Sequence, residues 1–378
     1  MLCHFISICM LLYPNIDHEK SDTTHDSIVN VKSLYSFFED LALISEANQI
    51  VSILHIGDSH IQADYFTGKL RKNFQNQFGN SGRGLVFPYT IANSNGSSDV
   101  KFDHQGDWNL LSKRKKNNQA KTGILGYTLW PGSNAKFSIQ VDYNGPSKFS
   151  KIILWDTFGT FLPFNNKSIV TWERKSGYTE ISSTSPLHQI DFKSTHSSGD
   201  QPTLNGIVLQ NDSVGILYHA AGINGATVAQ YLLSDFSQNI IDLNPNLLII
   251  SLGTNDCYTT INQFCASCVK ENYRILIRRI RINNPTLPIL LSTPPDHFYK
   301  RKYDNVNIES LRKVLHELVY EENVALWDLF QIMGGSNSIS DWQKQGLAAK
   351  DLIHFSVKGY EKQGDLLYQT LMKYYPLE

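Results

Sequence analysis

A chain of 378 residues with 11% aromatic and 18% charged side chains can bury a sizeable core and is too aromatic to be disordered. Its length favours two domains, and its formal net charge of −1 gives no electrostatic reason to bind nucleic acid or an acidic membrane. We therefore expect a neutral or small partner.

The N-terminal segment, residues 1–30, is interpreted as a signal or a disordered end. Residues 5–13 form an apolar run that is too short to span a bilayer but long enough for the core of a secretory signal. No Lys or Arg precedes Lys20 and no small-residue cleavage site stands out, so a mis-assigned start and a frayed terminus stay open as alternatives. We favour export to the periplasm or the cell envelope.

Two separate stretches, residues 31–92 and 213–378, predict one α/β domain. In the first, a helix leads into a buried strand at 53–56, and the following helix ends at Phe78–Gly79, where glycine can take a left-handed conformation. The second stretch alternates helical patterns with strands at 214–218, 247–252, 287–291 and 324–327. Five strands alternating with helices predict a doubly wound, flavodoxin-like parallel sheet.

Residues 93–212 predict an inserted β-sandwich domain. They lack an amphipathic helical pattern and are rich in Gly, Ser, Asn and Thr. Short strands are expected at 137–143, 152–155, 169–172 and 206–209. The ends of the insertion should lie close together, as insertions normally require, and the basic run 113–116 is interpreted as a solvated loop.

The cysteines leave the redox compartment open. Cys265 and Cys268 have the spacing of a metal or redox motif, but no second ligand pair follows at a distance that suits zinc. We expect one disulfide or plain thiols near a loop. Which of Cys257, Cys265 and Cys268 would pair stays open.

Ser59 is the candidate nucleophile. It lies in Gly57-Asp58-Ser59-His60, directly after the first buried strand, and open α/β sheets place their ligand sites at the carboxyl ends of strands. The alternative is a serine that only caps a helix or forms a turn. A serine hydroxyl also needs a base, so the catalytic interpretation requires a histidine from elsewhere in the chain.

His354 is the candidate base, with Asp351 to orient it. The two residues are about one helical turn apart, so the carboxylate can fix the ring tautomer and stabilise the imidazolium. The rivals for the base are His60, His219 and His297, and an ordinary surface Asp and His pair is the alternative interpretation.

Gly225 and Asn255 are candidate donors to an oxyanion. Each follows a predicted strand, and the backbone N–H of Ser59 would be a third donor. Alternatively, Gly225 only turns the chain and Asn255 only forms an Asx turn. A binuclear metallophosphoesterase, suggested by Asp58-x-His60, ranks lower because too few further ligands follow.

Together, four motifs resemble those of the SGNH (GDSL-type) hydrolases: Gly57-Asp58-Ser59-His60, Gly222-Ile223-Asn224-Gly225, Gly253-Thr254-Asn255-Asp256 and Asp351-x-x-His354. The resemblance implies a triad of Ser59, Asp351 and His354 with an oxyanion hole of Ser59, Gly225 and Asn255. The usual leucine of the first motif is His60 here. The longer run 56–64 and the β insertion are similar to bacterial peptidoglycan O-acetylesterases, whose inserted domain resembles a carbohydrate-binding module.

This resemblance implies contacts to a glycan. Trp108 and Trp130 of the insertion are candidates to stack on sugar rings, whereas Trp155 and Trp172 lie in apolar strands and are predicted to be core. Arg83 is a candidate partner for a muramyl or peptide carboxylate, and an unpaired surface arginine is the alternative.

We expect a serine esterase that removes O-acetyl groups from a cell-wall glycan, most readily peptidoglycan, without a metal or organic cofactor. An acetylesterase for another polysaccharide and a lipid-directed acyl hydrolase are the alternatives within enzymes. A non-catalytic glycan-binding protein on a hydrolase scaffold is the alternative outside them. The sequence leaves open the sugar position and the oligomeric state, and it predicts no membrane span.

Overall fold

A computed structural model describes residues 27–112, 122–142, 145–165, 169–195, 203–233 and 236–375. Most of the predicted N-terminal signal and the basic run 113–116 lie outside these residues. Residues 28–29, which the sequence assigned to the N-terminal segment, form a short strand instead.

The central sheet has six strands in the order β1-β19-β16-β15-β2-β14. Five of them are parallel, as predicted: β2 (Ile50–Gly57), β14 (Gly215–Gly222), β15 (Leu247–Ser251), β16 (Ile289–Ser292) and β19 (Ala325–Trp327). The sixth strand, β1 (Ile28–Val29), is antiparallel to β19 and was not expected. Numbered along the chain, the parallel strands have the flavodoxin-like order 2-1-3-4-5, whose ligand crevice lies where the order reverses, beside β2.

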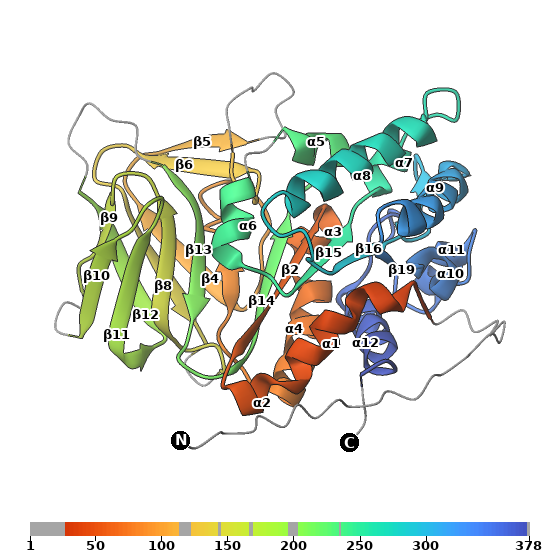
Figure 1. Ribbon diagram of the computed structural model, residues 1–378. Coiled ribbons are helices and arrows are strands. Elements are labelled where there is room, and N and C mark those ends of the chain that lie inside the picture. Colours follow the sequence, from red (N-terminus) through yellow and green to blue (C-terminus); the bar gives the residue numbers. More distant parts are fainter. Residues whose placement is uncertain are drawn as a thin grey trace, which may run out of the picture.

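Helices cover both faces of this sheet (Figure 1). Alternate residues of a strand enter opposite cores: Ile53 packs with helices α1 (Tyr35–Ala42), α4 (Tyr65–Phe78) and α12 (Val357–Met372), whereas Leu54 packs with α8 (Ala266–Arg281) and α9 (Asn307–Glu321). This is the doubly wound arrangement that the sequence predicted. Helix α4 ends at Phe78, and Gly79 follows with a φ of 95°.

Short elements complete the α/β part. They are the 3₁₀ helix η1 (Val31–Leu34), the helices α2 (Ile44–Ala47), α3 (Ser59–Gln62), α5 (Val228–Leu232), α6 (Ser237–Leu243), α7 (Thr254–Cys257), α10 (Leu329–Met333) and α11 (Ser338–Lys344), and the strands β17 (Phe298–Tyr299) and β18 (Tyr303–Asp304). None of the described helices is both long and apolar enough to cross a bilayer.

Two antiparallel sheets form the β-rich part on the left of Figure 1. One contains β10 (Val170–Arg174), β11 (Thr179–Leu187), β8 (Phe149–Asp156), β13 (Leu204–Gln210), β6 (Tyr127–Pro131) and β5 (Trp108–Ser112), with β3 (Gly84–Val86) paired to β13. The other contains β4 (Val100–Gln105), β7 (Lys136–Val141), β12 (Gln189–Ser194) and β9 (Phe161–Pro163). Buried residues of both sheets share one core, as in a β-sandwich.

The chain enters and leaves this β-rich part through neighbouring segments. Asn211 N donates to Ser81 O at 2.9 Å, and β3 pairs with β13. The β sheets therefore begin before residue 93, where the insertion was expected to start. Trp155 is buried as predicted, but Trp172 is 52% exposed because β10 is an edge strand; the prediction that it belongs to the core is wrong.

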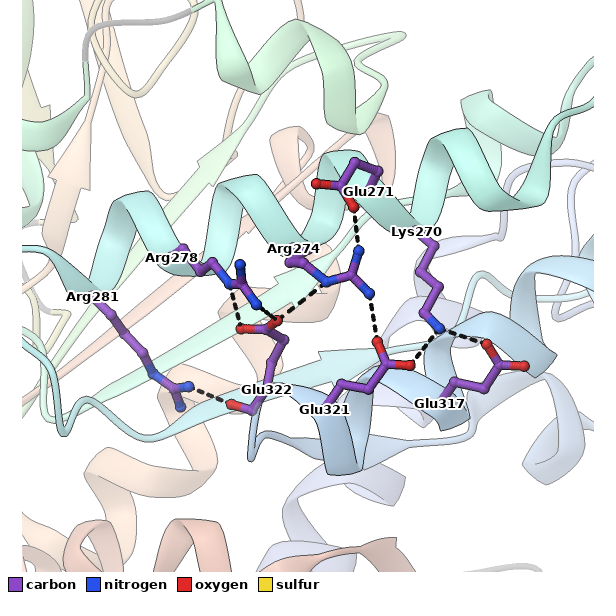
Figure 2. A network of polar contacts seen from close by, with 8 residues as sticks. All are labelled: Lys270, Glu271, Arg274, Arg278, Arg281, Glu317, Glu321 and Glu322. Atoms are coloured by element: carbon purple, nitrogen blue, oxygen red, sulfur yellow. Dashed lines mark hydrogen bonds and ion pairs between the residues drawn. The ribbon is translucent and has the colours of Figure 1, made fainter.

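A network of ion pairs joins α8 to α9 on the outer surface (Figure 2). Lys270 Nζ lies 2.6 Å from both Glu317 and Glu321, and Arg274 also pairs with Glu321 at 2.6 Å. Exposed pairs of this kind contribute only about 0–1 kcal/mol each to the free energy of unfolding. Burial of the apolar side chains between the two helices therefore stabilises their packing more than the ion pairs do. At the start of α8, Cys265 and Cys268 form a disulfide, whereas Cys257 is a buried free thiol.

Candidate active site

Ser59 lies where β2 turns sharply into α3. Asp58 caps the helix, because its Oδ1 accepts the backbone N–H of His60 at 3.0 Å. Ser59 is thus the first helical residue and not the cap, which leaves its hydroxyl free for another role. Gly57 allows the tight turn, since a Cβ there would lie 2.6 Å from Ser251 O.

The structure brings Ser59, His354 and Asp351 together. Ser59 Oγ is 3.0 Å from His354 Nε2, although 295 positions separate the two residues, and His354 Nδ1 is 2.7 Å from Asp351 Oδ2. The other carboxylate oxygen, Oδ1, accepts the backbone N–H groups of Ile353 and His354 at 3.0 and 2.9 Å. The carboxylate therefore fixes both the turn and the imidazole, an arrangement that can make a serine nucleophilic.

The hydrogen bonds to Asp351 also keep it ionised. Burial on its own would raise the pKa of Asp351, but the hydrogen bonds from the His354 side chain and from the two backbone N–H groups lower the pKa below its ordinary value. An ionised Asp351 is the form that stabilises an imidazolium at His354.

The other candidate bases do not face the Ser59 hydroxyl. His60 is buried, its Nδ1 lies 2.9 Å from the Tyr360 hydroxyl, and burial lowers its pKa well below the usual value. His297 is buried with Nδ1 2.9 Å from Pro295 O. His219 is buried inside β14. Only His354 among the four lies at hydrogen-bond distance from Ser59 Oγ in the described structure.

Gly225 and Asn255 lie beside Ser59 at the ends of neighbouring strands. Gly225 follows β14 with a φ of 76°, and a Cβ there would meet no atom within 4 Å, so the residue faces open space. Asn255 follows β15 and donates from Nδ2 to Ala226 O at 3.0 Å and to Asp58 Oδ2 at 3.3 Å. To hold an oxyanion, the Asn255 amide must give up the longer of these contacts.

Two carboxyls, the buried Asp58 and the half-buried Asp256, belong to the segments that carry Ser59 and Asn255. Burial raises the pKa of Asp58 to about 6 and that of Asp256 to about 7. Asp256 accepts the backbone N–H of Val228, at the start of α5, at 3.2 Å, and so connects the Asn255 segment to the Gly225 turn.

A cavity of about 560 Å³ opens at these residues. Ser59, Gly225, Asn255 and His354 form part of its wall, and Asn95, Tyr258, Arg301 and Tyr360 are among the residues that complete it. The sequence motifs did not predict that these last four residues line the cavity, because tertiary contacts between distant segments bring them near Ser59. Among the described residues, no three His, Cys, Asp or Glu side chains gather as they would around a metal ion.

The three candidate glycan contacts do not line this cavity. Arg83 is only 2% exposed and forms ion pairs with Asp64 and Asp99, so its guanidinium is not available to a substrate carboxylate; the prediction that it binds substrate is overturned. Trp108 stacks on Phe161 at a centroid distance of 5.7 Å and donates its indole N–H to Gln105 O. Trp130 is half-buried in β6. Stacking of these two tryptophans on a sugar stays a prediction.

Comparisons with known proteins show a family match and a shared fold. Residues 195–362 match the model of the GDSL-like Lipase/Acylhydrolase family. No curated protein matches the chain. The chain is similar to a solved structure of a peptidoglycan O-acetylesterase at 24% identity and a TM-score of 0.73, over 89% of this chain and 95% of that one.

Smaller solved structures match only part of the chain. An acetyl xylan esterase matches at 18% identity and a TM-score of 0.34, over 41% of this chain and 80% of its own. A GDSL-like lipase from Bacteroides thetaiotaomicron matches at 21% identity and a TM-score of 0.34, over 41% of this chain and 76% of its own. The family match and the shared fold make the chain similar to the SGNH hydrolases, with residues 195–362 matching the model of the GDSL-like Lipase/Acylhydrolase family.

Proposed function

We propose that this protein is a serine esterase that removes O-acetyl groups from a cell-wall glycan, with peptidoglycan as the substrate. The observation that carries the proposal is the continuous contact from Ser59 Oγ through the His354 ring to Asp351, at 3.0 and 2.7 Å. In the proposed roles, Ser59 is the nucleophile, His354 the general base and Asp351 the residue that orients it.

The reaction takes two steps. Ser59 Oγ attacks the acetyl carbonyl carbon while His354 Nε2 takes its proton, and the oxyanion is held by the N–H groups of Ser59 and Gly225 and by Asn255 Nδ2. The intermediate collapses, the C–O bond to the sugar breaks, and His354 returns the proton to the sugar oxygen. Water, deprotonated by His354, then attacks the carbonyl carbon of the acetyl-enzyme, the bond between that carbon and Ser59 Oγ breaks, His354 returns the proton to Ser59 Oγ, and acetate leaves.

Two observations favour a glycan as the acyl carrier. The cavity wall combines amide and hydroxyl groups, which can hydrogen-bond to sugar hydroxyls, with the rings of Tyr258 and Tyr360, which can stack on a sugar. The solved structure that shares the fold over 89% of this chain is a peptidoglycan O-acetylesterase. We propose further that residues 93–212 act as a carbohydrate-binding module on a hydrolase domain built from 31–92 and 213–378, and that the protein is exported to the cell envelope.

The catalytic roles can be tested with a small aryl acetate. Ser59→Ala and His354→Ala should each lower kcat by about 10³-fold or more, because the nucleophile or its base is lost. Exposed residues of the same types supply the controls: Ser213→Ala and His104→Ala should retain activity. A fluorophosphonate probe should label Ser59 in the wild type. Activity that survives in Ser59→Ala would refute the proposal.

The substrate can be tested by comparing acetate release. Wild-type protein should release acetate faster from acetylated peptidoglycan than from acetylated xylan, and its rate on aryl esters should fall as the acyl chain grows. A preference for long acyl chains would instead support a lipid-directed hydrolase, and faster release from xylan would move the substrate to another polysaccharide.

A further inference from the structure

A basic hairpin tip stands at the rim of the cavity. Strands β17 and β18 pair Phe298 with Asp304 and Tyr299 with Tyr303, so the three residues between them, Lys300-Arg301-Lys302, form the tip. Three consecutive cations create a strong local positive potential although the whole chain has a net charge of −1.

The hairpin is held firmly against the catalytic residues. Phe298 N donates to Leu352 O at 2.9 Å, inside the segment that carries Asp351 and His354. Lys300 N donates to the Tyr258 hydroxyl at 3.1 Å, and the Tyr258 and Tyr299 rings meet edge to face at a centroid distance of 5.2 Å. These contacts fix the backbone of the tip relative to His354.

The three cations of the tip differ in their surroundings. Lys300 Nζ lies over the Tyr299 ring at 5.2 Å, and Lys302 Nζ lies over the Tyr303 ring at 5.3 Å. Arg301, between them, is exposed and lines the cavity that contains Ser59. Within the described part of the chain its guanidinium has no hydrogen bond and no ion pair.

No carboxylate of the described residues forms an ion pair with Arg301. Both oxygens of Asp351 are engaged by His354 and by backbone N–H groups, and Asp304 accepts a hydrogen bond from Asn337 at 3.1 Å. Among the described residues that line the cavity, Arg301 is the only Arg or Lys, and there is no Asp or Glu. The arginine is thus a fixed cation at the wall of a cavity that no carboxylate lines.

We propose that Arg301 selects substrates whose acetylated sugar bears a carboxylate close to the ester. A guanidinium binds a carboxylate through two parallel hydrogen bonds, which gives orientation as well as attraction. This inference rests on the proposed esterase function and refines it: the carboxylate contact that the sequence suggested for Arg83 belongs to Arg301. An exposed, charge-assisted contact of this kind is expected to be worth roughly tenfold in kcat/KM.

The test uses a matched pair of substrates. One is a 6-O-acetylated N-acetylhexosamine with a lactyl ether that ends in a free carboxylate, and the other is the same sugar with the carboxamide. The wild type should prefer the carboxylate by roughly tenfold in kcat/KM, mainly through KM, and high salt should reduce the preference. Arg301→Gln should bring the ratio close to one, and Arg301→Lys should restore part of it because it keeps the charge without the planar fork.

Variants of the flanking cations are the controls. Lys300→Gln and Lys302→Gln remove the same charge from the same tip and should change the ratio by less than about twofold, because these side chains do not line the cavity. If either lysine variant lowers the ratio as much as Arg301→Gln does, the assignment to Arg301 is overturned.

Two further outcomes separate this inference from the function on which it rests. A wild type that hydrolyses both sugars equally, or an Arg301→Gln variant that keeps the preference, overturns the role of Arg301 and leaves the esterase intact. A wild type that hydrolyses neither sugar nor an aryl acetate overturns the proposed function as well. An acetylated sugar phosphate is a third substrate, and if it surpasses the carboxylate, the assignment of a carboxylate is overturned.

Discussion

The side-chain oxygen of Gln62 accepts a hydrogen bond of 2.7 Å from the backbone N–H of Asn224, the residue before Gly225. The Nε2 atom of the same side chain donates to Asn95 O at 2.7 Å and to Ser94 Oγ at 2.8 Å. Gln62 is only 3% exposed, so one buried amide joins the end of α3, the loop around Asn95 and the turn that carries Gly225. Gln62 is therefore a positioning residue for the proposed oxyanion hole.

We expect Gln62→Met to lower kcat on an aryl acetate by roughly tenfold or more, with a much smaller change in KM. Methionine fills a similar volume but cannot hold the Asn224 N–H, so the neighbouring Gly225 N–H loses its fixed direction, and small misplacements of catalytic groups are costly. Steady-state kinetics and the rate of fluorophosphonate labelling of Ser59 should fall together.

Gln75→Met is the matched control for this variant. Gln75 also donates part-buried hydrogen bonds, to Gly82 O at 2.8 Å and to Ile216 O at 3.1 Å, but neither of these partners lines the cavity. Its variant should lose stability to a similar extent and keep kcat. Equal kcat values for the wild type and Gln62→Met would show that the amide network has only a structural role.

Asp351→Asn should reduce kcat by about 10³ to 10⁴-fold with little change in KM. The asparagine oxygen can still accept the backbone N–H groups of Ile353 and His354, so the turn should survive, but its NH₂ group would face His354 Nδ1 and favour the wrong tautomer. The kinetics should be measured together with thermal unfolding to confirm that the fold persists.

Asp341→Asn provides a comparison for that variant. Asp341 pairs with Lys344 three residues later, as Asp351 does with His354, but its side chain is 67% exposed and lies outside the cavity. Its loss should alter neither kcat nor stability by much. Activity of Asp351→Asn within tenfold of the wild type would contradict an orienting role for this carboxylate.

The sequence predicted the elements that are buried in regular patterns. Strands β2, β14 and β15 are largely apolar runs that are each followed by a helix, and the helical spacing of Leu276, Ile277 and Ile280 indicated α8. Strands such as β11 (TEISSTSPL) were missed because most of their residues are polar and one face is exposed. The periodic spacing of apolar residues reflects which side chains are buried, so a strand with little buried surface shows no clear periodic pattern in the sequence.

The candidate site likewise contains residues that the sequence predicted and residues that it did not. Ser59, Gly225, Asn255 and His354 stand at strand ends or in short motifs, and the sheet order alone brings such positions together. Arg301 lines the cavity, and Gln62 holds the lining residues Asn95 and Asn224, only through tertiary contacts that no local pattern encodes. The burial of Arg83 depends on Asp64 and on Asp99, which lies 16 positions further along the chain.

Arg83→Gln should destabilise the fold by about 3 kcal/mol instead of weakening substrate binding. The buried carboxylate of Asp64 pairs with both Arg71 and Arg83, and removing one partner of a buried ion pair leaves an under-compensated charge. Urea unfolding would measure the loss. Arg301→Gln removes the same side chain from an exposed position and should change the free energy of unfolding by less than about 0.5 kcal/mol. A stable Arg83→Gln variant with a raised KM would return Arg83 to the list of substrate contacts.

His219→Leu should make the protein less sensitive to acid. His219 is fully buried in β14, neither ring nitrogen has a hydrogen-bond partner among the described residues, and burial, with Arg71 and Arg83 nearby, lowers its pKa to about 3. In the unfolded chain this histidine binds a proton near pH 6.5, whereas in the folded chain it stays neutral down to about pH 3. Because the unfolded state binds more protons in that range, the free energy of unfolding decreases as pH falls from about 6.5 towards 3. Between pH 8 and pH 5 this histidine lowers the free energy of unfolding by about 2 kcal/mol.

The leucine variant lacks that proton uptake. Urea unfolding at pH 8 and pH 5 should therefore show a smaller loss of stability for His219→Leu than for the wild type, by about 2 kcal/mol. The exposed His104 of β4 serves as the control, because the same substitution there removes a histidine that is not buried, and His104→Leu should follow the wild type. Equal losses for the wild type and His219→Leu would mean that His219 is protonated in the fold, which requires a partner or water at a ring nitrogen.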